Sequence, residues 1–225
     1  MPENQEPDHP AVRYEYFEHD VGAADFIAAA LPIARCYQHV FGTDRSWNEG
    51  GQCPKCSKPG ADKKWNFHEA PPKCPDCEGD VQDYWPIPRI IGDMRQELGK
   101  PHAVCVVARM GSEVAGCCWG YSTTIEELEG HLNHGLVPEV RVQGIASALA
   151  ERFPGVQRVV YLDEIFVAPE HQGQKIGREL FRRRHERFVA MGFAVITMRT
   201  KSDPPTRRSR RFGSTTRKPS HWASV

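Results

Sequence analysis

The chain of 225 residues lacks any long uninterrupted hydrophobic run. Its most apolar stretch, residues 21–36, is interrupted by Asp25, Pro32 and Arg35, and it is too short and too polar to cross a bilayer. The first ten residues are acidic and carry prolines, so they also lack the basic start and apolar centre of a secretion signal. We therefore expect no membrane partner and a cytoplasmic protein with reduced thiols.

The sequence also lacks net charge, with 29 basic and 29 acidic side chains, which excludes an overall basic protein. The neutral sum hides an asymmetry, because residues 1–30 carry seven acids and one base while residues 201–225 carry seven bases and one acid. Residues 1–10 are expected to be a disordered lead. Residues 201–225 have no apolar periodicity and are expected to be a flexible basic tail, which could contact nucleic acid or pair with the acidic start.

Hydrophobic periodicity predicts a mixed α/β (α+β) domain. Alternating or continuous apolar runs predict strands at 12–17, 102–110, 113–123, 159–167 and 193–200, and helical spacing predicts helices at 23–41, 89–98, 125–132, 139–152 and 175–191. The last strand, helix and strand form a βαβ unit. The content of 26% charged and 9% aromatic residues is that of an ordinary soluble globular protein.

Residues 48–88 form a proline-rich inserted module with two Cys-Pro-x-Cys knuckles. The knuckles are Cys53 with Cys56 and Cys74 with Cys77, separated by 17 residues. Two such knuckles supply four thiolates to one tetrahedral ion, so the spacing predicts a zinc ribbon with structural Zn²⁺. Two disulfides or four free thiols are the alternative, and a ribbon can also bind nucleic acid or protein. The remaining cysteines are expected in the core: Cys36, Cys105, Cys117 and Cys118.

The stretch of residues 161–180 reads as a strand, a Gln/Gly-rich turn and a helix with Lys175 and Arg178 in its first turn. Free amides at a helix start bind anions, and glycine lets a phosphate approach the backbone closely. Acidic side chains normally favour this end of a helix, so the two cations indicate a bound anion.

These residues resemble the acetyl-CoA site of the GNAT superfamily of N-acetyltransferases. The family signature is Gln or Arg, two residues, Gly, one residue, then Gly or Ala, and here it reads QGQKIG over residues 172–177, preceded by EIFVAPEH over residues 164–171. The resemblance implies that acetyl-CoA is held by the strand before the signature, by the signature amides and by one arginine: Ile165, Phe166, Val167, Gln172, Gly173, Gln174, Lys175, Ile176, Gly177 and Arg178. Lys175 departs from the pattern, since a glycine is usual there.

The resemblance also implies direct acetyl transfer with Glu164 as the general base, the alternative being a surface or structural carboxylate. By strand alternation, Asp163 is expected on the opposite face, so that only one of the two carboxylates serves. The family's general acid is often a tyrosine near the end of the domain, and residues 201–225 contain none. The basic side chains of the helix at 175–191 either form a solvated face or attract the 3′-phosphate of coenzyme A.

Taken together, the resemblance implies a GNAT-like domain over residues 11–200 that has a mixed central sheet flanked by helices. The ribbon at 48–88 interrupts this domain. The expected activity is transfer of an acetyl group from acetyl-CoA to a primary amine, which the sequence leaves open as that of a small molecule, a protein terminus, a lysine or an RNA. The alternative is a catalytically decayed domain whose ribbon and basic tail bind nucleic acid or protein.

Overall fold

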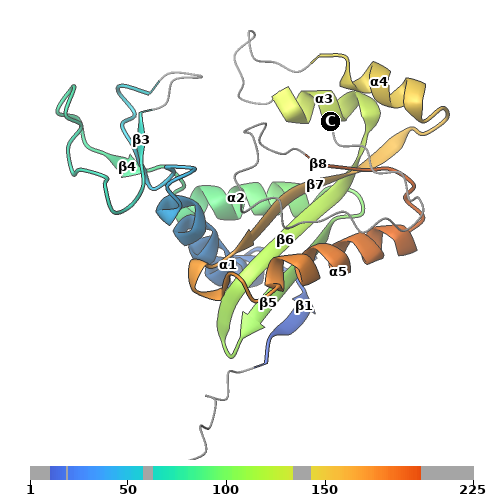
Figure 1. Ribbon diagram of the computed structural model, residues 1–225, viewed down its shortest axis with the longest axis horizontal. Coiled ribbons are helices and arrows are strands. Elements are labelled where there is room, and N and C mark those ends of the chain that lie inside the picture. Colours follow the sequence, from blue (N-terminus) through green and yellow to red (C-terminus); the bar gives the residue numbers. More distant parts are fainter. Residues whose placement is uncertain (1–10, 19, 58–62, 134–142, 199–225) are drawn as a thin grey trace, which may run out of the picture.

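The computed structural model describes residues 11–18, 20–57, 63–133 and 143–198 (Figure 1). The expected disordered lead at 1–10 and the basic tail at 201–225 lie outside these residues. Within the described part of the chain, no helix combines the length and the apolar character that a membrane span requires.

The centre of the fold is a five-stranded mixed sheet in the order β1-β5-β6-β7-β8. Its strands are β1 (Arg13–Tyr16), β5 (Val104–Met110), β6 (Glu113–Thr124), β7 (Arg158–Val167) and β8 (Ile196–Met198). The first four strands pair antiparallel, and β8 pairs parallel to β7. This arrangement confirms the predicted mixed sheet.

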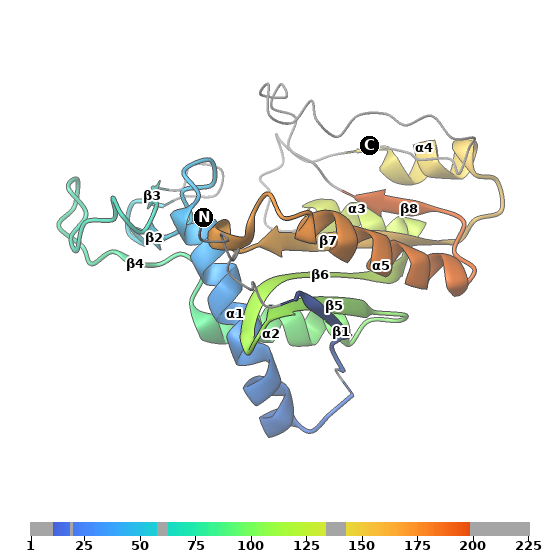
Figure 2. The same cartoon turned by 60° about the horizontal axis from the view of Figure 1, so that its bottom comes forward.

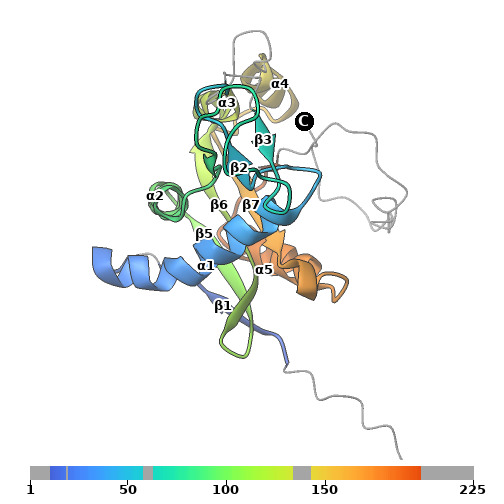
Figure 3. The ribbon, with the colours of Figure 1, turned by 90° about the vertical axis from the view of Figure 1, so that its left-hand side faces the viewer.

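Helices cover both faces of the sheet, as Figure 3 shows with α2 (Ile87–Leu98) on one side and α5 (Ile176–Ala190) on the other. The helix α1 (Ala23–Thr43) shares the face of α2. In β5, Cys105 and Val107 pack under α1 and α2, while Val104 and Val106 pack under α5. Alternate side chains of one strand therefore enter two cores, which explains its continuous hydrophobic run.

A third cluster closes one end of the sheet beneath α3 (Ile125–Asn133) and α4 (Ile145–Arg152). The sequence predicted a helix at 139–152, but residues 143 and 144 precede α4 and are not helical. Gly144 caps the helix with a left-handed φ of 78°. Residues 139–142 lie outside the described residues. The last strand is also shorter than predicted, since residues 193–195 precede it.

The inserted module forms a small antiparallel sheet in the order β3-β2-β4, beyond the end of α1 (Figure 2). Its strands are β2 (Gly51–Gln52), β3 (Lys64–Trp65) and β4 (Gln82–Asp83). The backbone amide of Phe67 donates to the carbonyl of Gly42 at 2.7 Å. A Cβ on Gly42 would lie 2.1 Å from the Phe67 ring, so the last turn of α1 needs glycine for this contact.

The strand β7 contains a β-bulge in its middle. Trp119 of β6 pairs with Glu164 and the next residue, Gly120, pairs with Leu162, so Asp163 has no partner in this ladder. Leu162 packs in the α5 core and Phe166 in the α1–α2 core, although both would share a face in a regular strand. The extra residue brings Asp163 and Glu164 onto the same side, where both interact electrostatically with Glu97 of α2, and the expectation of opposite faces is wrong.

A buried arginine of α5 bonds to the backbone at the bulge. Arg184 is fully buried, and its Nη1 donates to the carbonyls of Trp119 at 2.5 Å and Glu164 at 2.6 Å. Burial lowers the pKa of this guanidinium, partly offset by nearby cysteines and Asp163. The bond to Glu164 connects α5 to the residue expected to act as base.

We predict that Arg184→Met lowers the free energy of unfolding by about 2 kcal/mol, because two buried carbonyls lose a donor. Urea unfolding followed by circular dichroism measures the change. Arg182→Met is the matched control, since the exposed Arg182 pairs with Glu179 and Glu186 of the same helix, and its loss should cost less than about 1 kcal/mol. Equal stability of the two variants would contradict this role for Arg184.

Candidate active site

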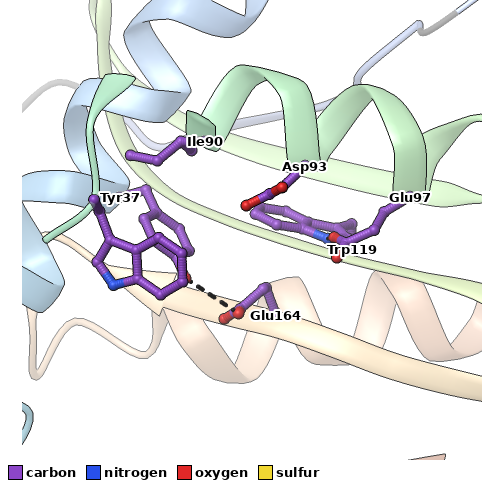
Figure 4. Close-up of a pocket in the computed structure, with 7 residues that line it drawn as sticks. Tyr37, Ile90, Asp93, Glu97, Trp119 and Glu164 are labelled. Atoms are coloured by element: carbon purple, nitrogen blue, oxygen red, sulfur yellow. Dashed lines mark hydrogen bonds between the residues drawn. The ribbon is translucent and has the colours of Figure 1, made fainter. Parts of the chain in front are cut away.

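A cavity of about 740 Å³ lies along the bulged half of β7. Its walls come from α1 and the residues just after it, from the two ends of the ribbon module, Glu49 and Trp85, and from β7 with the turn after it. The lining residues are Tyr37, Val40, Phe41, Asp44, Trp47, Glu49, Trp85, Tyr161, Asp163, Glu164, Ile165, Phe166, Val167 and Gln172. A smaller cavity of about 70 Å³ shares Tyr37, Trp85 and Glu164 and is lined also by Ile90, Asp93, Glu97 and Trp119 (Figure 4). The predicted base therefore lines both spaces.

Glu164 faces α1, where the hydroxyl of Tyr37 donates to its Oε1 at 3.3 Å (Figure 4). Tyr37 is buried, and this burial followed by the charge of Glu164 raises its pKa well above the ordinary value. Tyr37 therefore stays protonated at neutral pH and can donate to the carboxylate. Tyr37 lies in the helix that the sequence predicted at 23–41, and the sequence gave no signal of this contact.

Two further carboxyl groups lie beside Glu164. Burial and then the charge of Asp163 raise the pKa of Glu97 to about 9, while the indole of Trp119 donates to Glu97 Oε2 at 2.6 Å. Burial and the charges of Asp163 and Glu97 also raise the pKa of Tyr121. Sequence reasoning missed Glu97, although an acid between the buried Met94 and Leu98 of an amphipathic helix is a usable signal.

The strand β7 has an open edge along the cavity. The strand β8 pairs only with residues 160–162 of β7, so Ile165, Phe166 and Val167 have β6 on one side and no described strand on the other. Ile165 is exposed and Phe166 is buried in the α1–α2 core. An extended ligand can hydrogen-bond to backbone groups along such an edge.

The turn after β7 has the geometry of an anion site at a helix start. The first hydrogen bond within α5 runs from the amide of Glu179 to the carbonyl of Lys175, so the amides of residues 176–178 have no acceptor inside the helix. Gly173 has a left-handed φ of 81°, and the side-chain amide of Gln172 donates to the carbonyl of Val167. The predicted signature residues are thus gathered between the open strand and α5.

Lys175 caps α5 in the left-handed conformation, with φ of 65°. The helix begins at Ile176, one residue later than predicted. An L-residue pays about 1 kcal/mol to adopt this conformation, which glycine adopts freely. The need for positive φ explains why glycine is usual at this point of the signature. Lys175 and Arg178 are both exposed and make no ion pair with a described residue.

The four knuckle cysteines converge within the ribbon. All four sulfurs lie within 4.8 Å of one another, with Cys53 Sγ 3.5 Å from Cys77 Sγ and Cys56 Sγ 3.7 Å from Cys74 Sγ. None is joined in a disulfide. A tetrahedral ion with Zn–S bonds of about 2.3 Å spaces its sulfurs about 3.8 Å apart, so the thiolates fit Zn²⁺ and leave no position for water. Cys105, Cys117 and Cys118 are buried in the sheet and Cys36 is half-buried, as predicted for core residues.

Sequence comparison relates the chain to one family. The profile of the "Acetyltransferase (GNAT) family" matches residues 67–212, which is more than half of the chain and includes the bulged strand and the signature turn. No curated protein sequence matches the chain.

Solved structures of similar fold include several acetyltransferases, all at low identity. Arylalkylamine N-acetyltransferase 2 from Aedes aegypti is 14% identical, with a TM-score of 0.46 over 82% of this chain and 74% of that one. The aminoglycoside acetyltransferase meta-AAC0020, from an uncultured soil metagenomic sample, is 10% identical, with a TM-score of 0.44 over 94% and 95%. A ribosomal-protein-alanine N-acetyltransferase from Brucella melitensis biovar Abortus 2308 is 12% identical, with a TM-score of 0.41 over 96% and 97%.

The raised pKa of Glu97 predicts a loss of stability at alkaline pH. Between its ordinary value near 4.5 and about 9, the folded protein binds more protons than the unfolded chain, so the free energy of unfolding falls as pH rises. Glu97→Gln keeps an acceptor for Trp119 and removes this titration. Its melting temperature should therefore fall less than that of the wild type between pH 6 and pH 9. Calorimetric melts at four pH values measure the difference.

Glu126→Gln is the matched control, because Glu126 is exposed on α3. Its melting temperatures should follow those of the wild type across the pH range. A Glu97→Gln curve parallel to the wild-type curve would show that Glu97 is ionised in the folded protein at pH 6.

Proposed function

The chain belongs to the acetyltransferase (GNAT) family, and we propose that it transfers an acetyl group from acetyl-CoA to a primary amine of a small molecule or a protein. One observation carries the proposal. The bulge places Glu164 in the wall of a cavity that also includes the open edge of β7 and the first signature residue, Gln172. A carboxylate is thus next to the region where the thioester of acetyl-CoA is expected.

Acetyl-CoA would lie along the open edge and end at the turn. The backbone of Ile165, Phe166 and Val167 would hydrogen-bond to the pantetheine arm. The pyrophosphate would rest on the amides of residues 172–177, namely Gln172, Gly173, Gln174, Lys175, Ile176 and Gly177. The exposed Arg178 would reach a phosphate, and the side chain of Lys175 would add a second positive charge there.

The acceptor amine would enter as an ammonium ion and give one proton to Glu164, directly or through water. The freed nitrogen lone pair attacks the thioester carbonyl carbon, and the C–S bond breaks with its electron pair on sulfur. The second proton lost by the nitrogen neutralises that sulfur. Tyr37 donates to Glu164 Oε1 and would hold the carboxylate toward the acceptor.

We also propose that Cys53, Cys56, Cys74 and Cys77 bind one Zn²⁺ and that its role is structural. The supporting observation is the convergence of four sulfurs in a module whose strands are two residues long. Such short strands cannot hold a fold by themselves, so the metal would supply the stability of the ribbon.

We predict that Glu164→Gln lowers kcat at least 100-fold, because general-base catalysis typically contributes a factor of about 10² to 10⁴. The affinity for acetyl-CoA should stay within about twofold, since the proposed cofactor contacts of β7 are made by backbone groups. Release of free thiol in the presence of an amine measures transfer, and calorimetry measures acetyl-CoA binding.

Glu170→Gln is the matched control, because Glu170 is an exposed acid in the turn after β7 and does not line the cavity. It should retain wild-type activity. Full activity of Glu164→Gln across pH 6–9 would remove Glu164 as the base. No binding of acetyl-CoA at millimolar concentration would contradict the enzyme, and salt-sensitive RNA binding lost on deletion of residues 201–225 would then favour the alternative of a decayed binding module.

Purified protein is predicted to contain about one zinc ion per chain. The double variant Cys53→Ser with Cys56→Ser should lose the metal and melt at a lower temperature, because two thiolate ligands are removed. Elemental analysis measures the zinc and circular dichroism measures the melting temperature. Cys36→Ser, a thiol of α1 outside the cluster, should keep the full zinc content. A wild-type protein that is folded and free of metal would end the zinc proposal.

A further inference from the structure

We propose that Arg184 is a positioning residue for acetyl transfer, which holds the backbone of β6 and β7 so that the Glu164 carboxylate stays in the cavity. This inference rests on the proposed function and adds to it a residue that lines neither cavity. The two carbonyls that Arg184 binds belong to Trp119 and Glu164, which are direct partners in the strand ladder beside the bulge.

The guanidinium of Arg184 and the proposed base lie on opposite faces of the sheet. Arg184 extends from α5, whose core includes Cys118 of β6 and Leu162 of β7. The side chain of Trp119 packs in the core under α1 and α2, and that of Glu164 accepts a hydrogen bond from α1. Both side chains line the smaller cavity (Figure 4). Arg184 therefore bonds to the backbone behind one wall of that cavity.

A single nitrogen of Arg184 makes both bonds. Its Nη1 donates to the carbonyls of Trp119 and Glu164, whereas its Nε and Nη2 are buried and have no hydrogen-bond partner among the described residues. Two carbonyls that accept from one nitrogen are held close together, so β6 and β7 cannot separate or slide there without losing a bond. The positive charge strengthens both bonds relative to those between neutral groups.

The buried face of α5 shows why an arginine at this position needs an explanation. Its buried residues recur every four positions and are Ile176, Leu180, Arg184 and Phe188. An aliphatic side chain at position 184 would continue this apolar row and would avoid the desolvation of a charge. It would offer no donor to the two strands. The bulge therefore accounts for the arginine better than the packing of the helix does.

The bulge at Asp163 gives Glu164 its place, and a small shift there would move the carboxylate. Displacement of a catalytic group by about 1 Å can cost about 100-fold in rate. The cofactor phosphates are expected at the start of α5, eight residues before Arg184 and so about 12 Å away along the helix. Loss of Arg184 should therefore lower kcat and leave the affinity for acetyl-CoA almost unchanged.

A double-mutant cycle of Arg184→Met and Glu164→Gln tests this role. Transfer from saturating acetyl-CoA is measured with n-butylamine, lysine and a peptide with an N-terminal alanine, and the best acceptor is kept. Arg184→Met should lower kcat at least tenfold, with acetyl-CoA affinity by calorimetry within threefold of the wild type. Added to Glu164→Gln, it should lower the residual kcat less than threefold, because the base that it positions is already absent. Equal losses in both backgrounds would overturn the inference.

Arg184→Lys asks whether one donor nitrogen is enough. Lysine cannot replace arginine where two guanidinium nitrogens bond, but here one nitrogen makes both bonds, and an ammonium can do the same. The kcat of Arg184→Lys should stay within threefold of the wild type, and a value as low as that of Arg184→Met would contradict the proposal. If Arg184→Met does not fold, Arg184→Gln takes its place in the cycle, since it removes the charge and shortens the donor.

Phe188→Leu is the matched control for lost stability. Phe188 lies one turn further along the same buried row, and its ring packs against Phe193 after the end of α5. The variant should lower the melting temperature and keep kcat within twofold of the wild type. A loss of kcat as large as that of Arg184→Met would show that any damage to the α5 core lowers activity, which would overturn the inference.

Crystal structures of the variants separate this inference from the proposed function. In Arg184→Met, the backbone of Glu164 should move by about 1 Å or more and its contact with Tyr37 should be lost, while Arg184→Lys should keep both. An unmoved Glu164 in Arg184→Met would overturn the inference, and this comparison decides even if none of the three amines is acetylated. Absence of acetyl-CoA binding, or full activity of Glu164→Gln, would instead overturn the proposed function or its base.

Discussion

One extra residue in β7 determines the chemistry available at the centre of this fold. The bulge at Asp163 changes which face of the sheet the side chains after it occupy. Leu162 therefore fills the α5 core, while Glu164 and Phe166 face α1. At the same place, the buried Arg184 of α5 donates to the backbone carbonyl of Glu164. The position of the Glu164 carboxylate and the packing of α5 are therefore linked, because the Arg184 guanidinium donates to one carbonyl of β6 and one of β7.

The sequence predicted the features that depend on local patterns. The spacing of Cys53, Cys56, Cys74 and Cys77 predicted a cluster, and the structure brings those sulfurs together. Periodicity located the sheet and most helices, since each element buries apolar residues at its own period. The bulge was missed because the alternation rule assumes an uninterrupted pair of strands, and nothing in the letters of β7 marks its interruption.

The same limit applies to residues that reach the site from distant elements. Tyr37 of α1 and Glu97 of α2 lie beside Glu164 of β7 through tertiary packing and not through any local sequence pattern. The signals in the sequence place both on helices near buried positions, and three-dimensional packing is needed to show which strand they approach. The positive φ of Lys175 is likewise a property of the turn, and it gives a physical reason for the glycine that resemblance alone suggested.

The chain enters and leaves the inserted module at neighbouring points. Gly51 pairs with Asp83, and the amide of Tyr84 donates to the carbonyl of Gly50, so about thirty intervening residues span almost no distance. An insertion with adjacent ends can enter a loop between two helices without separating them.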